Sequence, residues 1–148
     1  MDQLSRQLRD VIDRVSQEFG RYSDSDAAKP IQREGWSRKQ VLGHLIDSAS
    51  NNHQRFVRAL LQDELVWPNY DQEGCVRAQR YQEARWADLV ELWTSYNRFL
   101  SHVLAGIPEN KLQTICRIGD HDAMTLEALA IDYLAHMQHH LDQIRSQT

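Results

Sequence analysis

The sequence predicts an all-α protein that folds as a four-helix bundle. Apolar residues recur with helical spacing over four segments of roughly 20 residues each. The 148 residues include six glycines and three prolines, too few for a loop-rich β-sandwich or a disordered chain. Helix-ending and helix-starting residues separate the four segments. We therefore expect one bundle domain spanning residues 1–148.

The first predicted helix ends at Gly20, a common signal at the C-terminal end of a helix. Residues 21 to 36 are expected to form a connector. Ser37 is a good N-cap for a second helix over residues 38 to 61, which is long enough to span the domain. The apolar positions of the first helix follow helical spacing: Leu4, Leu8, Val11, Ile12, Val15 and Phe19.

The longest stretch without helical periodicity covers residues 62 to 80. We expect a turn at its WPNYD run and another break at Gly74. A loop of this length is often a functional cover, and a packed surface excursion is the alternative. Tyr70, Asp71 and Arg77 are candidate substrate contacts, although their interpretation as surface loop residues is favoured.

The second half of the chain predicts two more helices. A third helix over residues 83 to 105 ends at Gly106, and residues 107 to 124 form the next connector. Thr125 is the expected N-cap of a last helix over residues 126 to 145.

Composition excludes several classes of function. A net charge of −4 with scattered arginines gives no electrostatic footprint for nucleic acid. The apolar runs are too short for a membrane span, and the polar N-terminus MDQLSRQLRD is not a signal peptide. Cys75 and Cys116 lack a paired pattern, so we expect reduced thiols without a nucleophilic role, and a bacterial-type cytoplasmic location. The tryptophans are interpreted as core or interface residues: Trp36, Trp67, Trp86 and Trp93.

The segment YLAHMQHHLDQIR, residues 133 to 145, contains three of the seven histidines. At about 100° per residue, His136 and His140 lie on the apolar side of the last helix, whereas His139 is turned outward. This i, i+4 pair is typical of metal-binding helices. Two hydrogen-bonded histidines at the edge of the core are an equally weighted alternative, and the HExxH pattern is absent.

A third ligand must come from elsewhere in the bundle. Periodicity leaves the choice open, because His44 lies at the flank of an apolar face and His53 lies nearer its centre. His44 shares its polar strip with Ser48, Asn51 and Arg55. The candidates are His44, His53, His102, His121, Asp47 and Asp132.

Several segments together resemble the DinB-like superfamily, also called the DinB/YfiT-like metalloenzymes. They are Trp36-Ser37 followed by VLGHLIDS, then YQEARWADLVELW, then Asp132-Tyr133 leading into HMQHHLDQI. The resemblance covers nearly the whole chain. Its specificity lies in the combination of GHLIDS on the second helix with HxxHHxxQI on the last.

The resemblance implies an antiparallel bundle of up-down-down-up character, often a homodimer. It also implies a divalent transition metal, zinc or nickel, held by His44, His136 and His140. Relatives that look similar include transferases that use mycothiol, bacillithiol or glutathione, and an isomerase acting on maleylpyruvate. All three motif histidines are intact here.

Three functional hypotheses follow. The leading one is attack of a metal-activated low-molecular-weight thiol on a small electrophile, as in an S-transferase. The alternative within the enzyme class is hydrolysis by a metal-activated water. A non-enzymatic dimeric stress-response or binding module with a structural metal is a third. Asp47 and Asp132 are candidates for orienting the ligands, and Gln143 is a candidate site contact.

Overall fold

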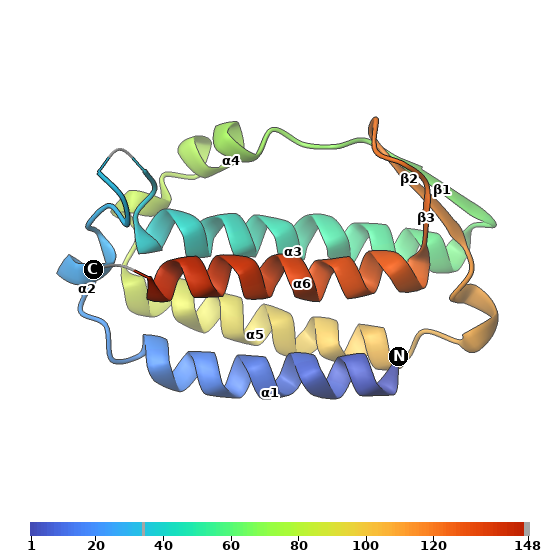
Figure 1. Ribbon diagram of the computed structural model, residues 1–148, viewed down its shortest axis with the longest axis horizontal. Coiled ribbons are helices and arrows are strands. Elements are labelled where there is room, and N and C mark those ends of the chain that lie inside the picture. Colours follow the sequence, from blue (N-terminus) through green and yellow to red (C-terminus); the bar gives the residue numbers. More distant parts are fainter. Residues whose placement is uncertain (34, 147–148) are drawn as a thin grey trace.

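Four long helices form the body of the computed structural model, which describes residues 1–33 and 35–146. They are α1 (Asp2–Phe19), α3 (Arg38–Leu61), α5 (Trp86–Ala105) and α6 (Leu126–Arg145). Helices α1 and α6 run in one direction, and α3 and α5 run in the other (Figure 1). The predicted four-helix bundle and its up-down-down-up order are confirmed.

The capping residues predicted from the sequence end and begin the helices as expected. Ser37 forms a capping box with Gln40 at the start of α3. The Thr125 hydroxyl accepts a hydrogen bond from the backbone N–H of Ala128 at the start of α6. Gly20 and Gly106 follow the last residues of α1 and α5. The boundaries of these helices are therefore set by local hydrogen bonding.

The connectors contain more regular structure than the sequence predicted. Residues 21 to 36 include a short helix, α2 (Asp24–Ala27), and residues 62 to 80 include β1 (Glu64–Trp67) and α4 (Gln72–Ala78). Residues 107 to 124 hold a 3₁₀ turn, η2 (Glu109–Lys111), then β2 (Ile115–Ile118) and the start of β3 (Met124–Thr125). The third long helix begins at Trp86 rather than at residue 83, because a 3₁₀ turn, η1 (Tyr81–Glu83), precedes it.

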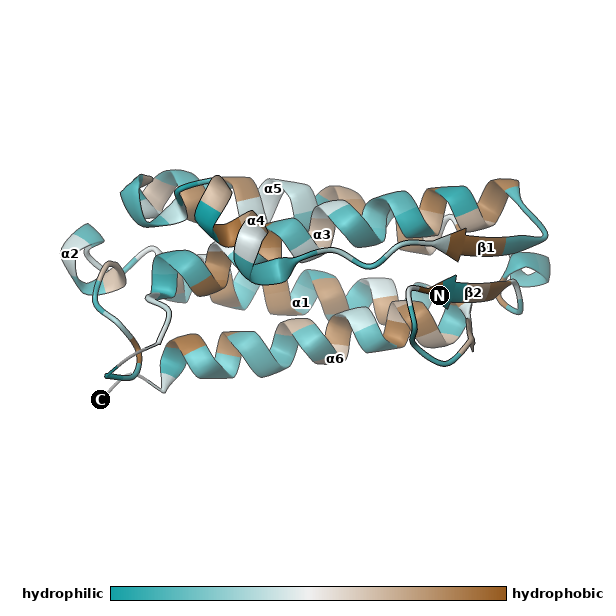
Figure 2. Cartoon of the chain, turned by 90° about the horizontal axis from the view of Figure 1, so that it is seen from above, coloured by the Kyte–Doolittle hydropathy of each residue, from teal (hydrophilic) through white to brown (hydrophobic). Residues whose placement is uncertain are grey.

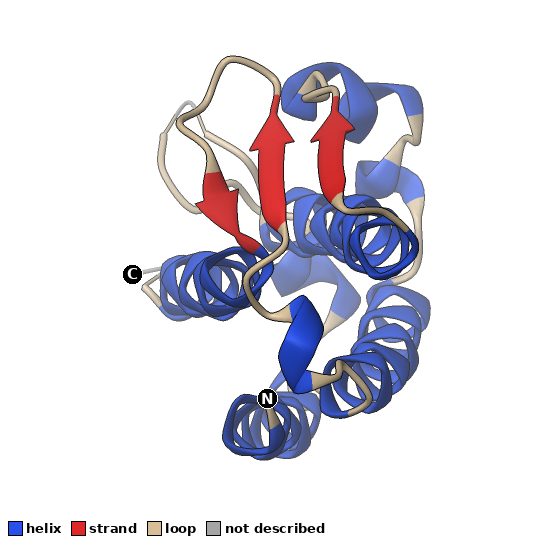
Figure 3. Cartoon of the chain, turned by 90° about the vertical axis from the view of Figure 1, so that its right-hand side faces the viewer, coloured by secondary structure: helices blue, strands red, loops and turns tan. Residues whose placement is uncertain are grey.

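The three strands form a small sheet at one end of the bundle, in the order β1-β2-β3 (Figure 3). Strand β1 is parallel to β2, and β2 is antiparallel to β3. Leu65 pairs with Cys116, and both side chains are buried, whereas Val66 and Ile115 are exposed. This period-two burial explains why such short segments become strands.

Gly74 lies inside α4, so its interpretation as a break was wrong. The Asp71 side chain caps α4 by accepting a hydrogen bond of 2.9 Å from the Gly74 N–H. A Cβ atom at position 74 would stand 2.1 Å from Asp71 Oδ2. Glycine at this position therefore permits the cap and does not interrupt the helix.

The core lies between the apolar faces of the long helices. Helix α5 packs against α1 and α3, and α3 also packs against α6. The indole N–H of Trp86 donates to the Phe19 carbonyl, and Trp93 is fully buried, so the core role predicted for these two tryptophans is confirmed. No helix among the described residues is long and apolar enough to cross a membrane.

The segment between α3 and α5 folds back over α3 instead of projecting into solvent. Strand β1, helix α4 and the turn η1 all contact α3. Figure 2 shows α4 and the segment that leads to it lying above this helix. The polar residues along that side of α3 are therefore covered by protein, which positions the site described next.

Candidate metal centre

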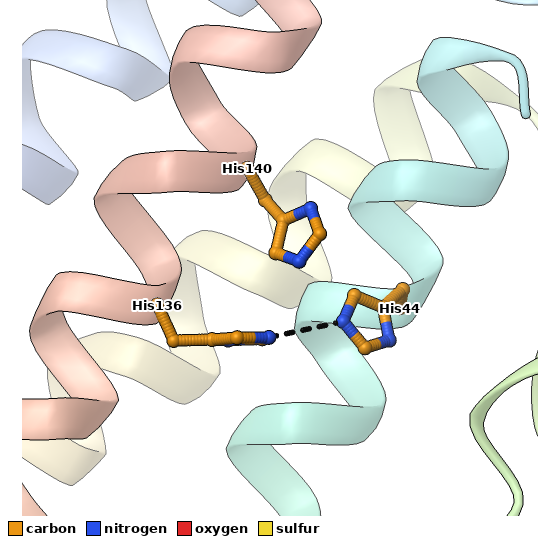
Figure 4. Close-up of side chains that lie close together, drawn as sticks. All are labelled: His44, His136 and His140. Carbon is orange, nitrogen blue, oxygen red and sulfur yellow. Dashed lines mark hydrogen bonds between the residues drawn. The ribbon is translucent and has the colours of Figure 1, made fainter.

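Three histidines from two helices meet in the upper half of the bundle. His44 comes from α3, and His136 and His140 come from α6 (Figure 4). One ring nitrogen from each lies within 4.8 Å of the others. The Nε2 atoms of His44 and His136 are 3.2 Å apart. The three residues named from the family resemblance are thus brought together, in a geometry that can hold one ion.

Burial keeps these imidazoles in their neutral form. Loss of hydration, together with the neighbouring His140 and His136, lowers the pKa of His44 to about 4. Burial and His140 lower the pKa of His136 to about 4, against the opposing charge of Asp132. The pKa of His140 is also lowered, mainly by burial. Neutral imidazole is the form that binds a metal, so all three are in the ligating state at neutral pH.

Gln143 fixes the ring of His140. Its Oε1 atom lies 2.9 Å from His140 Nδ1 and accepts the Nδ1–H. The lone pair of His140 is then on Nε2, the atom that faces the other two histidines (Figure 4). Gln143, which the sequence suggested as a site contact, is therefore a positioning residue.

His44 is held by the packing around it. Its side chain is 1% exposed, and its Nδ1 atom is buried without a hydrogen-bond partner in the described structure. The ring of Trp36 lies 5.4 Å from that of His44, centroid to centroid. Sequence reasoning assigned Trp36 to the core or an interface and missed this contact, for which the spacing gave no signal.

Gly43, the residue before His44, allows the connector of residues 62 to 85 to approach α3 closely. This connector is called the covering segment. A Cβ atom at Gly43 would lie 2.2 Å from Cδ2 of Tyr81, so the tyrosine ring rests on the bare backbone of α3. The Tyr81 hydroxyl donates a hydrogen bond of 2.7 Å to Asp47 Oδ1. Gln79 Nε2 donates to the same oxygen at 2.6 Å. Asp47 therefore anchors the covering segment, and the expectation that it orients a ligand N–H is not met.

The other candidate ligands lie away from the three histidines. The Nδ1 atom of His53 is 3.1 Å from the Tyr96 hydroxyl, on the side of α3 that faces α5. His102 packs beside the Phe99 ring. His121 lies 3.3 Å from Asn69 Nδ2 in the connector before β3. His139 is exposed, as the helical wheel predicted.

A cavity of about 380 Å³ opens beside the histidines. Its volume falls in the range of small-molecule sites. His136 lines it, and so does Asp132, the second acidic candidate from the sequence. The remaining lining residues come from α3, α6 and both connectors: Ser48, Asn52, Arg55, Asn69, Tyr70, Gln72, Ile118, His121, Asp122, Met124, Leu129 and Tyr133.

The three candidate contacts of the long connector have different environments. Tyr70 lines the cavity, and burial raises its pKa to about 12, so its hydroxyl stays protonated. Asp71 is instead the N-cap of α4. Arg77 is exposed and lies beside a separate hollow near Trp36. Tyr70 is thus a half-buried loop residue that faces the cavity, whereas Asp71 and Arg77 are exposed.

Neither cysteine is among the described residues that line the cavity. Cys75 and Cys116 are both free thiols. Burial raises the pKa of each, which disfavours the reactive thiolate. The expectation that neither is a nucleophile agrees with these environments.

Comparison with known proteins gives the same family and the same fold as the sequence resemblance. A family model described as the DinB superfamily matches residues 7–144. The protein named "Putative metal-dependent hydrolase BH0277", from Halalkalibacterium halodurans, is 24% identical over 130 residues, covering 81% of this chain and 70% of that protein. YfiT from Bacillus subtilis, described as a probable metal-dependent hydrolase with an unusual four-helix bundle topology, has a TM-score of 0.85 at 24% identity. That match covers 99% of this chain and 84% of YfiT.

Proposed function

This chain belongs to the DinB superfamily, and on that premise we propose that it is a metal-dependent hydrolase of small molecules. The observation that carries the proposal is the convergence of His44, His136 and His140, with one ring nitrogen of each within 4.8 Å of the others. His136 also lines a cavity of small-molecule size. His44, His136 and His140 would hold a divalent cation. A relative named for metal-dependent hydrolysis supports the same reaction class.

The donor set fits such an ion. Three neutral imidazoles leave at least one coordination position for water or substrate, which separates a catalytic site from a closed structural one. The lone pairs of two facing Nε2 atoms at 3.2 Å repel each other unless a proton or a cation lies between them. Imidazole ligands suit zinc and nickel, the two metals implied by the family resemblance.

The cation would supply Lewis acidity, activating water and polarising the scissile carbonyl. Residues of the chain would accept a proton, bind the substrate and orient a ligand. Asp122 and Asp132 both line the cavity, and Asp132, whose charge acts on His136, is the proposed acceptor of a proton from the attacking water. Tyr70 keeps its proton at neutral pH and can donate a hydrogen bond to the substrate. Gln143 holds His140 in the tautomer that leaves Nε2 free.

Thiol transfer, the leading hypothesis from sequence, has less support. The relatives found by comparison are named for hydrolysis, so they favour the alternative. The homodimer, the cytoplasmic location and the identity of the metal stay predictions.

The test is an ester and amide panel assayed with protein loaded separately with zinc and nickel. Wild type should hydrolyse at least one member, and His44→Ala should lose the activity together with the metal. His139→Ala is the matched control, because this exposed histidine lies on the same helix as two of the ligands. Thiol consumption without hydrolysis would reject the hydrolase in favour of the transferase. Bound metal without any turnover would favour the structural module.

A further inference from the structure

We propose that the cavity beside the three histidines binds a small carboxylate substrate, and that Arg55 is the residue that recognises its carboxylate. The proposal rests on the proposed function, because it names the substrate class of the same site. It concerns the part of the cavity that lies along α3 from the histidines toward the sheet.

Arg55 is a buried cation without a balancing charge. Its residue is 8% exposed, and no carboxylate of the described chain forms an ion pair with it. Its Nε atom is buried without a hydrogen-bond partner, and Nη1 makes one long contact of 3.4 Å with Asn52 Oδ1. A buried charge of this kind carries a large desolvation cost unless something pairs with it. The geometry therefore leaves donors unused in a functional cavity.

The guanidinium reaches back along α3 and lines the same cavity as His136. Side chains of a helix lean toward its N-terminus, and Nη1 reaches back to Asn52. Ser48, Asn52 and Arg55 all line the cavity that His136 lines. Tyr70, on the facing connector, interacts electrostatically with Arg55. Ser48, Asn52 and Arg55 form the polar wall of the cavity on α3, and His136 lies in its wall on α6.

The covering segment keeps this wall away from bulk water. Tyr70 lies in it, between β1 and α4, and Tyr81 anchors the same segment to α3 through Asp47. A guanidinium screened in this way binds an anion more tightly than one on an open surface. Its planar fork matches a carboxylate with two parallel hydrogen bonds.

The charges on the wall favour a carboxylate over a phosphate. Arg55 is the one arginine or lysine that lines the cavity within the described chain, whereas Asp122 and Asp132 line it with the opposite sign. A phosphate dianion would leave one charge unpaired beside these acids. A monocarboxylate is neutralised by Arg55 alone.

The position of Arg55 also sets the length of the substrate. At 1.5 Å per residue, Asn52, the contact of the guanidinium, lies about 12 Å along α3 from His44. A substrate that reacts at the histidines and pairs with Arg55 is therefore elongated. A carboxylate separated by a short acyl or alkyl chain from the scissile bond fits this spacing.

Binding to metal-free protein tests the inference without relying on turnover. The probes are hexanoate, its neutral analogue hexanamide, and inorganic phosphate, each measured by isothermal titration calorimetry. We expect hexanoate to bind about 10-fold or more tightly than hexanamide, the effect of a charge-assisted hydrogen bond pair. Omitting the metal removes the alternative that the carboxylate binds the cation itself.

Variants assign the preference to one residue. Arg55→Gln should abolish the difference between hexanoate and hexanamide, and Arg55→Lys should retain part of it. Arg58→Gln is the matched control, because Arg58 lies one turn further on α3, packs on Trp67 and does not line the cavity. Circular dichroism and the melting temperature of each variant establish that it is folded.

Each outcome separates the two proposals. Equal binding of hexanoate and hexanamide by wild type, an unchanged preference in folded Arg55→Gln, or tighter Arg55-dependent binding of phosphate would overturn the carboxylate site. Carboxylate preference without ester hydrolysis by the metal-loaded protein would support the site and reject the hydrolase. Hydrolysis of mono-4-nitrophenyl suberate and 4-nitrophenyl octanoate with KM values equally affected by Arg55→Gln would retain the hydrolase and reject the site.

Discussion

The Nε2 atoms of His44 and His136 lie 3.2 Å apart, although 92 positions separate the two residues in the chain. His44 is buried and His136 is half-buried. The ring of His140 lies 4.7 Å from that of His44 and 4.6 Å from that of His136, centroid to centroid. Two imidazole nitrogens at this distance either share a proton or direct two lone pairs at one cation. The central claim is that they share a divalent cation.

The metal-free protein should lose stability as pH falls below 7. The folded-state pKa of His44 and of His136 is about 4, below the ordinary value of 6.5. Between these values the unfolded chain binds more protons, so the free energy of unfolding rises with pH and is lost as pH falls from about 6.5 toward 4. Urea denaturation at pH 7, 6 and 5 measures this. The dependence should be flatter in His44→Gln and unchanged in His102→Gln, which removes an exposed histidine that packs beside Phe99. Equal slopes in wild type and His44→Gln would contradict it.

Gln143→Ala should weaken metal binding by about 10-fold to 100-fold, the usual effect of losing a group that orients a ligand. The cause is the loss of the hydrogen bond between Gln143 Oε1 and His140 Nδ1. Competition titration with a chromophoric chelator gives the affinity. Gln138→Ala is the control, since Gln138 contacts Asp142 on the same helix and no histidine. Equal affinities in the two variants would rule out the positioning role.

Gly43→Ala should destabilise the protein by about 1–3 kcal/mol, the usual cost of forcing a group into packed surroundings. The new Cβ would stand 2.2 Å from the Tyr81 ring, so the covering segment must shift. Chemical denaturation measures the change. Gly106→Ala is the control, because a Cβ there meets its nearest atom at 3.5 Å. A Gly43→Ala protein as stable as wild type would show that the Tyr81 contact is not tightly packed.

Asp132→Asn should lower kcat by about 10²-fold or more, with little change in KM and with the metal retained, as expected for loss of a general base. Steady-state kinetics on the best ester of the panel, with metal quantified in the same sample, provides the test. Glu127→Gln, on the same helix but outside the cavity, should behave as wild type. Full activity in Asp132→Asn would remove this residue from the mechanism.

The last helix could be predicted in detail from the sequence. Its apolar positions follow helical periodicity, so the wheel correctly turned His136 and His140 inward and His139 outward. The caps Ser37 and Thr125 were also recognisable, because capping depends on local hydrogen bonds.

The burial of the polar residues on α3 could not be predicted from periodicity. Periodicity assigns polar residues to solvent, yet His44, Ser48 and Arg55 are all buried. The connector between α3 and α5 covers them, and its path depends on long-range contacts such as Tyr81 with Asp47. Only the family resemblance selected His44 over His53, and no sequence pattern indicated that Tyr70 faces the cavity.

The strands were missed for a related reason. The ELVW segment of β1 and the ICRI segment of β2 are four residues each, too short for periodicity to separate strand from loop. They pair because the bundle brings the two connectors to the same end, which is a consequence of topology. Burial alternates along both strands, but residue type does not, since the apolar Val66 and Ile115 are exposed.

The most direct test of the shared cation is the metal content of the purified protein. Protein prepared without added metal, then dialysed against zinc or nickel, is analysed by inductively coupled plasma mass spectrometry. We predict about one equivalent of a divalent transition metal in wild type and in His139→Ala, and its loss in folded His44→Ala, His136→Ala and His140→Ala. A wild-type protein that neither retains nor rebinds a transition metal would contradict the three-histidine centre.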